Sequence, residues 1–241
     1  MSTASALASE LKPYAGRVWR VVEAQHRIST NRLAASLEDQ RLLEELAEAV
    51  KPELPRAARG FHYLLASPFR YGHRTASRFR RADERPGIFY SSEAEATAVA
   101  ETAYWRLRFL SRSPGLAPPR TVTEHSSFSV ALRLDRLVDL TIPPFAEEGA
   151  AWTSDDYAEC QSLATSARQA SAQAIRSPSA RDPDRRCNVA LLDPAGFAER
   201  TPRTGKTWHL RIEGSTLIAL AAYPSDLQFR FPADQFGLTL G

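Results

Sequence analysis

The 241-residue chain lacks the long apolar runs, paired cysteines and lysine surplus that mark several large classes of protein. It has no stretch of about 18 apolar residues, so no transmembrane helix is predicted. Its first 16 residues contain neither the basic segment nor the apolar segment of a secretory signal. No secretory signal is therefore predicted, and the cytoplasm is the expected location. The two cysteines, Cys160 and Cys187, fit neither a metal-ligand spacing nor a disulfide framework.

Several familiar catalytic motifs are missing as well. The chain has no Gly-rich phosphate loop, no G-x-S-x-G, no H-E-x-x-H and no Cys/His metal set. These absences argue against P-loop nucleotide hydrolases, nucleophile-elbow hydrolases and zinc enzymes, and no bound metal is expected. The five histidines are scattered, and none has the spacing of a metal ligand or a catalytic base.

Lysine is scarce, and nearly every positive charge is an arginine. Only Lys12, Lys51 and Lys206 are lysines among 31 basic residues, and the net charge of +3 is too small to indicate nucleic acid by itself. A GC-rich coding bias explains most arginines. Because arginine binds phosphate or carboxylate through two parallel hydrogen bonds, a local cluster still predicts an anion site. That cluster comprises Arg70, Arg74, Arg78, Arg80, Arg81 and Arg85.

Apolar periodicity predicts a mixed chain of helices and strands. The expected strands are 17–22 (with Arg17 and Arg20 on opposite faces), 87–90, 128–134, 137–142, 208–212, 217–221 and 229–231, plus a strand–loop–strand at 174–192. The expected helices begin at Ser36, at Ser91 or Ser92, and at Thr153 or Ser154; the first is a surface helix ended by Pro52. No repeat or linker divides the chain, so residues 1–241 are expected to form a single α+β domain.

The helix that follows strand 87–90 is a candidate to carry a functional glutamate. Ser92 and Glu95 have the spacing of a capping box, and an alanine-rich run with high helix propensity follows. Glu101 flanks the apolar stripe of this helix about two and a half turns from its start. From periodicity alone, Glu101 fits a solvated position, which is the more common case, or a position facing a cleft at the end of the strand.

Two long segments, Phe69–Phe109 and Ala174–Leu192, resemble RES-domain proteins, a family named for an arginine, a glutamate and a serine. Weaker agreement at 17–22 and 207–214 extends the likeness, in the same order, from about residue 17 to residue 231. The interval from Tyr90 to Glu101 is its most specific feature. Arg78, in an Arg-Phe pair, resembles the family arginine.

Ser179, in the frame I-R-x-x-S-x-R-D, resembles the family serine. Ser177 and Pro178 precede it where the family pattern has an aromatic and then a variable residue. This departure bears on the pose of Ser179 rather than on its identity.

The resemblance implies a fold related to the ADP-ribosyltransferases, with mixed β-sheets and flanking helices and a core at about residues 17–231. It implies the toxin of an Xre/RES type II toxin–antitoxin module that consumes NAD+ as a phosphorylase or glycohydrolase. Phosphate is then a co-substrate if it, rather than water, is the acceptor. The implied partner is an Xre-type helix-turn-helix antitoxin that covers the cleft. Nucleic acid would be contacted only through that antitoxin, no membrane is involved, and a homodimer is left open.

The implied site residues are Arg78, Tyr90, Glu101 and Ser179, with Arg20 as a weaker second arginine. Cleavage of the nicotinamide–ribose bond builds positive charge on ribose C1, which an ionised Glu101 would stabilise. Arg78 would clamp the pyrophosphate or an incoming phosphate. Tyr90 would stack on the nicotinamide, and Ser179 would hydrogen-bond the substrate. Phosphate is already a nucleophile, so this chemistry needs no strong base.

Two alternatives remain open at this point. One is an ADP-ribosyltransferase toxin that modifies a specific protein. The other is a nucleic-acid-binding protein that uses the Arg70–Arg85 cluster, which predicts steeply salt-dependent binding and indifference to Glu101. The modest net charge counts against the second alternative.

Overall fold

The computed structural model describes residues 7–23, 36–113, 115 and 121–240. Within them, eight strands form one mixed sheet flanked by helices, which confirms the α+β class. None of the helices in this part of the chain has the length and apolar character that crossing a bilayer requires. The strands are β1 (Lys12–Glu23), β2 (Phe89–Ser92), β3 (Thr123–Asp139), β4 (Ala174–Pro178), β5 (Cys187–Leu191), β6 (Arg203–Glu213), β7 (Thr216–Ala221) and β8 (Gln228–Pro232). The α-helices are α2 (Leu37–Ala49), α3 (Tyr63–Arg70), α4 (Glu95–Ser111), α5 (Gly149–Thr153) and α6 (Ala158–Gln169).

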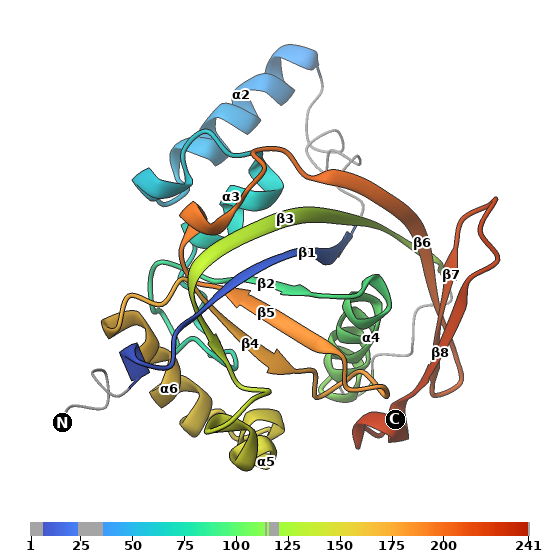
Figure 1. The fold of residues 1–241 in the computed structure, drawn as a ribbon. Coiled ribbons are helices and arrows are strands. Elements are labelled where there is room, and N and C mark those ends of the chain that lie inside the picture. The colour runs from blue at the N-terminus through green and yellow to red at the C-terminus, as the bar shows by residue number, and fades with distance from the viewer. Residues whose placement is uncertain (1–6, 24–35, 114, 116–120, 241) are drawn as a thin grey trace.

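Five strands close into a ring, because β1 pairs with both β2 and β3 in the order β1–β2–β5–β4–β3. The long antiparallel pair β1/β3 arches over β2, β5 and β4 (Figure 1). The pair β3/β4 is parallel, whereas the other pairs are antiparallel. Strands β6, β7 and β8 extend the sheet from β3, beyond the ring.

Side chains alternate between two faces of the short strands β2, β4 and β5. The inner face, which carries Phe89 and Leu191, packs against Val130 of the β1/β3 arch. The outer face, which carries Tyr90 and Ile175, packs against α6. Neighbouring residues of one strand therefore pack into different hydrophobic clusters. Only side chains on the same face of the sheet can contact each other.

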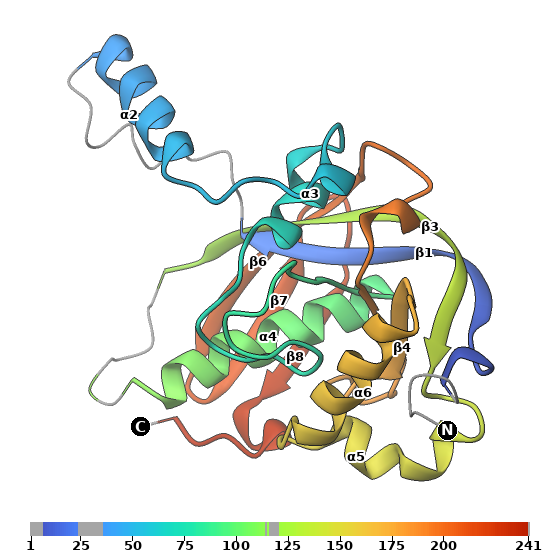
Figure 2. The same cartoon turned by 90° about the vertical axis from the view of Figure 1, so that its left-hand side faces the viewer.

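Helix α4 packs beside the β6–β8 extension (Figures 1 and 2). Its buried residues Val99, Ala103 and Leu107 contact a cluster that includes Trp208 and Leu217. Burial of each large apolar side chain of this kind stabilises the fold by roughly 1.5–3 kcal/mol. The helix that carries Glu101 is thus fixed by its apolar side, and its polar side is free to form a site.

The predicted capping box at the start of α4 is wrong. The N-cap is Ala94, and no side chain caps the helix. Ser92 instead donates to Oδ1 of Asn188 at 2.7 Å. The Glu95 carboxylate accepts hydrogen bonds of 2.6, 2.5 and 3.1 Å from Ser127, Lys206 and Trp208. Partners distant in sequence replaced the local capping interaction.

The strands predicted at 128–134 and 137–142 merge into one continuous strand, β3, which ends at Asp139, so the prediction is wrong for residues 140–142. The apolar alternation breaks at Asp135 and Arg136, which suggested an interruption. Oε1 of Gln173 accepts the backbone N–H groups of both residues, at 2.9 and 3.2 Å. This side chain supplies the hydrogen bonds that let the strand continue.

The predictions for the other two helix starts had different outcomes. Ser36 caps α2 as predicted, since its hydroxyl accepts from Asp39 N at 3.1 Å. Helix α2 projects from the body as a surface element, as expected (Figure 2). The helix expected from Thr153 or Ser154 begins only at Ala158, because residues 149–153 form the separate helix α5.

Candidate functional site

Glu101 and Ser179 are joined by a hydrogen bond although 78 residues separate them. Ser179 Oγ donates to Glu101 Oε1 over 2.8 Å. The same oxygen accepts from Nδ2 of Asn188, the second residue of β5, over 2.6 Å. Ser179 is 1% exposed, and Glu101 is half-buried. Among the described residues, these hydrogen bonds fix one carboxylate oxygen and leave Oε2 available to a ligand.

The loop after β4 is built around the Ser179 hydroxyl, which accepts from the backbone N–H groups of residues 181 and 182 at 3.1 and 3.0 Å. The buried carboxylate of Asp182 accepts two hydrogen bonds from Arg186, at 2.7 and 2.9 Å, and one from Thr97 of α4, at 2.5 Å. Although burial opposes it, these hydrogen bonds hold the pKa of Asp182 below its ordinary value. The loop is thereby tied to the helix that carries Glu101.

Tyr90 lies on the outer face of β2, where it pairs in register with Ala190. Asn188 is two residues earlier on β5 and so shares this face. The Tyr90 hydroxyl is 2.8 Å from Ser77 Oγ and accepts from Phe79 N at 3.1 Å. Burial raises the pKa of the phenol. Tyr90 therefore stands on the Asn188 side of the sheet and anchors the segment 71–88.

Arg78 binds the turn between α5 and α6. Its Nη1 donates to the carbonyl oxygens of Trp152 and Ser154, both at 2.8 Å. Its guanidinium lies 5.0 Å from the centre of the Tyr157 ring, within the range of a cation–π contact. Arg78 thus holds this turn in place.

The arginines of residues 70–85 do not converge as expected. Arg70 pairs with Glu48 of α2 at 2.6 Å. Arg80 is 3% exposed and donates to three backbone carbonyls of its own segment, at 2.7–3.0 Å. Arg78 points to the α5–α6 turn instead. An irregular segment must satisfy its carbonyl groups, and Arg80 supplies donors to three of them. Arg70, Arg78 and Arg80 therefore bind three different parts of the protein and do not form one shared anion site.

A different set of arginines converges one turn after Glu101. The guanidinium of Arg181 lies 3.7 Å from the centre of the Tyr104 ring, and that of Arg108 lies 5.6 Å from the same ring. Arg108 also donates to the Tyr157 hydroxyl at 3.5 Å, and Arg181 forms an ion pair with Asp155. These five residues (Tyr104, Arg108, Asp155, Tyr157 and Arg181) are called the Arg108–Arg181 group below.

Arg20 lies on the inner face of the sheet. Its guanidinium is 4.9 Å from the ring centre of Phe89, the residue before Tyr90, and adjacent strand residues face opposite sides. Its Nη1 is buried without a hydrogen-bond partner among the described residues. Burial lowers the pKa of Arg20 to about 10. The structure does not bring this arginine to Glu101.

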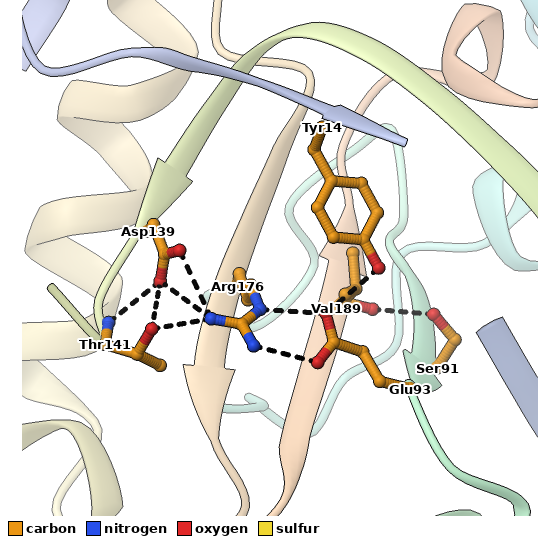
Figure 3. Close-up of polar contacts among 7 residues, drawn as sticks. All are labelled: Tyr14, Ser91, Glu93, Asp139, Thr141, Arg176 and Val189. Atoms are coloured by element: carbon orange, nitrogen blue, oxygen red, sulfur yellow. Dashed lines mark hydrogen bonds and ion pairs between the residues drawn. The ribbon is translucent and has the colours of Figure 1, made fainter. Parts of the chain in front are cut away.

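A polar network on the inner face connects the strands behind the site (Figure 3). Arg176 of β4 binds Glu93 through hydrogen bonds of 2.8 and 2.9 Å, and its Nη1 binds Asp139 at 3.2 Å and Thr141 at 2.6 Å. Tyr14 donates to Glu93 at 3.0 Å. Burial and the charge of Glu93 raise the pKa of Tyr14, and the hydrogen bonds to Glu93 raise that of Arg176.

Sequence reasoning did not single out Asn188 or the Arg108–Arg181 group. Tyr104 and Arg108 had a usable signal, because they lie three and seven residues after Glu101 and share its side of a helix. Asn188 had none, since only the pairing of β5 with β2 and β4 brings it to Glu101. Among the described residues, no group of three His, Cys, Asp or Glu side chains could hold a metal ion.

A family model described as the RES domain matches residues 53–213. A chain in the crystal structure of the M. tuberculosis MbcT–MbcA toxin–antitoxin complex is similar, with a TM-score of 0.49 and 13% identity over 86% of this chain and 91% of that chain. No curated protein matches the chain in sequence. The family match includes Arg78, Tyr90, Glu101 and Ser179, and it leaves β1, α2, β7 and β8 outside.

Proposed function

Because the chain belongs to the RES-domain family, we propose that it is the toxin of a toxin–antitoxin pair and that it consumes NAD+. The proposed reaction is cleavage of the nicotinamide–ribose bond with phosphate, or water, as the acceptor. The observation that supports it most is the carboxylate of Glu101, with Oε1 held by Ser179 and Asn188 and Oε2 left available.

In this reaction the bond between ribose C1 and the nicotinamide nitrogen breaks, and its electron pair leaves with nicotinamide. Positive charge builds on C1, and the ionised carboxylate of Glu101 would stabilise it through Oε2 or hold a ribose hydroxyl. An oxygen of phosphate forms the new bond to C1 and yields ADP-ribose phosphate. With water as acceptor, the attacking oxygen also loses a proton to solvent.

The other site residues are assigned roles that agree with their contacts. Ser179 would orient Glu101 and hydrogen-bond the substrate. Tyr90 would present its ring to the nicotinamide while Ser77 holds its hydroxyl. Arg78 would direct its remaining N–H groups to a phosphate while Nη1 holds the α5–α6 turn. Arg20, the weaker second arginine, would reach the substrate only from the inner face, where it lies against Phe89.

The experiment is incubation of the purified protein with NAD+, with and without phosphate, followed by mass spectrometry of the products. We expect loss of NAD+, and ADP-ribose phosphate when phosphate is present. Glu101→Gln should slow the reaction by about 100-fold or more, since it removes the charge that meets the developing cation. The matched control is Glu159→Gln, at an exposed position on α6, which should leave the rate unchanged. An intact NAD+ pool would remove the enzymatic proposal.

The same incubation separates the alternatives. Label from NAD+ that remains on a protein band would favour a protein ADP-ribosyltransferase over phosphorolysis. The nucleic-acid alternative is weaker than the sequence suggested, because Arg70, Arg78 and Arg80 are bound within the protein.

We propose an Xre-type helix-turn-helix antitoxin as the partner, as the family resemblance implies, with nucleic acid contacted only through it. The test is the reading frame next to the gene. Its product should bind this protein and restore the growth of cells that express it.

A further inference from the structure

Three arginines lie near the carboxylate of Asp155, because Arg181 is paired with it and both Arg108 and Arg78 contact Tyr157, two residues further along the chain. Arg181 is paired with it directly, and Arg108 and Arg78 are close enough to act on its charge. Partial burial raises the pKa of Asp155, but Arg181 above all, and then Arg108 and Arg78, lower it below its ordinary value. A position at which three arginines stabilise one anionic oxygen group has the charge that a phosphoryl group requires.

The two partners of this ion pair differ in how firmly they are held. The side chain of Arg181 is 9% exposed and lies against the ring of Tyr104, whereas the side chain of Asp155 is 66% exposed. An exposed carboxylate loses little free energy when it leaves an ion pair for water. A buried guanidinium that loses its anionic partner is strongly destabilised unless another anion replaces that partner. The arrangement therefore favours exchange of Asp155 for an incoming anion, with Arg181 staying in place.

The position of the group connects it to Glu101 and Ser179. Arg181 follows Ser179 by two residues, and its backbone N–H donates to the Ser179 hydroxyl at 3.1 Å. Tyr104 lies one helical turn from Glu101, a rise of about 5 Å along the axis. A dinucleotide whose reacting ribose contacts Glu101 would place phosphoryl groups at such a separation.

We propose that the Arg108–Arg181 group is a phosphoryl-binding subsite and that Asp155 is a built-in competitor, which the phosphoryl group displaces from Arg181. The identity of the ligand rests on the function proposed above, whereas the binding of phosphoryl anions does not. The phosphoryl group belongs either to the pyrophosphate of NAD+ or to the inorganic phosphate acceptor. Asp155 thus lowers the affinity of the empty site for anions and keeps Arg181 paired until a ligand arrives.

The test is calorimetric titration of the full chain with inorganic pyrophosphate at fixed ionic strength. Asp155→Asn should tighten binding about fivefold, the size of a lost ion-pair competitor near the surface. Arg181→Gln should weaken binding about tenfold or more, since it removes a charge-assisted hydrogen bond. The matched control is Asp156→Asn, which changes the same charge one residue away and keeps the Oδ1 that accepts from Ala158 N. Its dissociation constant should stay within about twofold of wild type.

Equal effects of Asp155→Asn and Asp156→Asn would overturn the proposal, and so would unchanged binding in a folded Arg181→Gln variant. If Arg181→Gln fails to fold, the comparison of the two aspartate variants decides alone, because both positions are exposed. Competition identifies the source of the phosphoryl group: displacement of pyrophosphate by ADP-ribose but not by orthophosphate assigns the subsite to NAD+, and the reverse assigns it to the acceptor. If the variants bind pyrophosphate as expected but the protein leaves NAD+ intact, the subsite stands and the proposed function is rejected. If the protein cleaves NAD+ but the two aspartate variants bind pyrophosphate equally well, the proposed function stands and the subsite is rejected.

Discussion

Arg176 and Glu93 face each other across two parallel hydrogen bonds, from Nε to Oε1 at 2.8 Å and from Nη2 to Oε2 at 2.9 Å. Arg176 precedes Ser179 by three residues, and Glu93 lies between β2 and the helix that carries Glu101. This pair therefore connects the two segments whose side chains meet in the candidate site. It acts through position and has no contact with Glu101 itself.

Replacement of Arg176 by lysine should lower both stability and the rate of NAD+ cleavage. Lysine keeps the charge but cannot form the two parallel bonds. We expect the free energy of unfolding, measured with urea, to fall by about 1–2 kcal/mol. The control is Arg211→Lys, whose partner Glu213 and own side chain are each about half exposed, and it should change stability by less than about 0.5 kcal/mol. Similar losses in both variants would show that the bidentate geometry has no special importance.

The hydrogen bond from Asn188 to Glu101 should matter more to activity than the bond that Asn188 accepts from Ser92. Asn188→Ala removes a donor from a carboxylate and should lower the rate of NAD+ cleavage about tenfold or more, since hydrogen bonds to charged groups are worth roughly 1.5–3 kcal/mol. Ser92→Ala leaves that donor in place and should lower the rate less than about threefold. Steady-state kinetics of the two variants, with melting temperatures as the folding control, make the comparison. The prediction fails if Ser92→Ala is as slow as Asn188→Ala.

Tyr90 should tolerate the loss of its hydroxyl better than the loss of its ring. Tyr90→Phe removes the bonds to Ser77 and Phe79 N and should cost about 1 kcal/mol of stability. If the ring stacks on nicotinamide, this variant keeps most of its affinity for NAD+, whereas Tyr90→Ala loses it. The measurement is KM for NAD+ in both variants. Equal KM values for Tyr90→Ala and wild type would remove the stacking role.

Glu199 should make stability depend on pH in the acidic range. The hydrogen bonds from Arg17, at 3.2 and 2.9 Å, are the largest of the causes that lower the pKa of Glu199 to about 2. A depressed folded-state pKa contributes stability that is fully present above the unfolded value of 4.5 and is lost as the pH falls toward about 2. The difference in unfolding free energy between wild type and Glu199→Gln should therefore be largest near neutral pH and vanish near pH 2. A difference that stays constant with pH would contradict the assignment, and Glu159→Gln should track wild type throughout.

The sequence predicts interactions between residues that are close in the chain, and it does not predict interactions between distant residues. The cap at Ser36 was predictable because its partner, Asp39, is three residues away. The cap predicted at Ser92 does not form, because its hydroxyl donates to Asn188 of another strand, and no local pattern indicates that partner. Likewise, the density of arginines in residues 70–85 gave no information about where each guanidinium would point.

The same difference separates the residues of the candidate site that the sequence indicated from those that it did not. The resemblance to a family indicated Glu101 and Ser179, and the structure brings them into contact. Asn188 and Arg181 reach the site only through strand pairing and the loop after β4, which no local pattern encodes. The prediction that Arg17 and Arg20 lie on opposite faces of their strand follows from alternation. Which of the two faces would point into the ring of strands depended on how β1 crosses the sheet, which the sequence does not show.

The closure of the strand ring by β1 has a practical consequence for protein production. The family match begins at residue 53, so a fragment that starts there and runs to residue 241 would keep Glu101 and Ser179 and lose β1. The backbone of β3 from 125 to 137, now paired with β1, would become a long open edge. Unpaired edges of this length recruit strands from other molecules. The shortened protein should precipitate, and its inactivity would then report aggregation rather than any defect in chemistry.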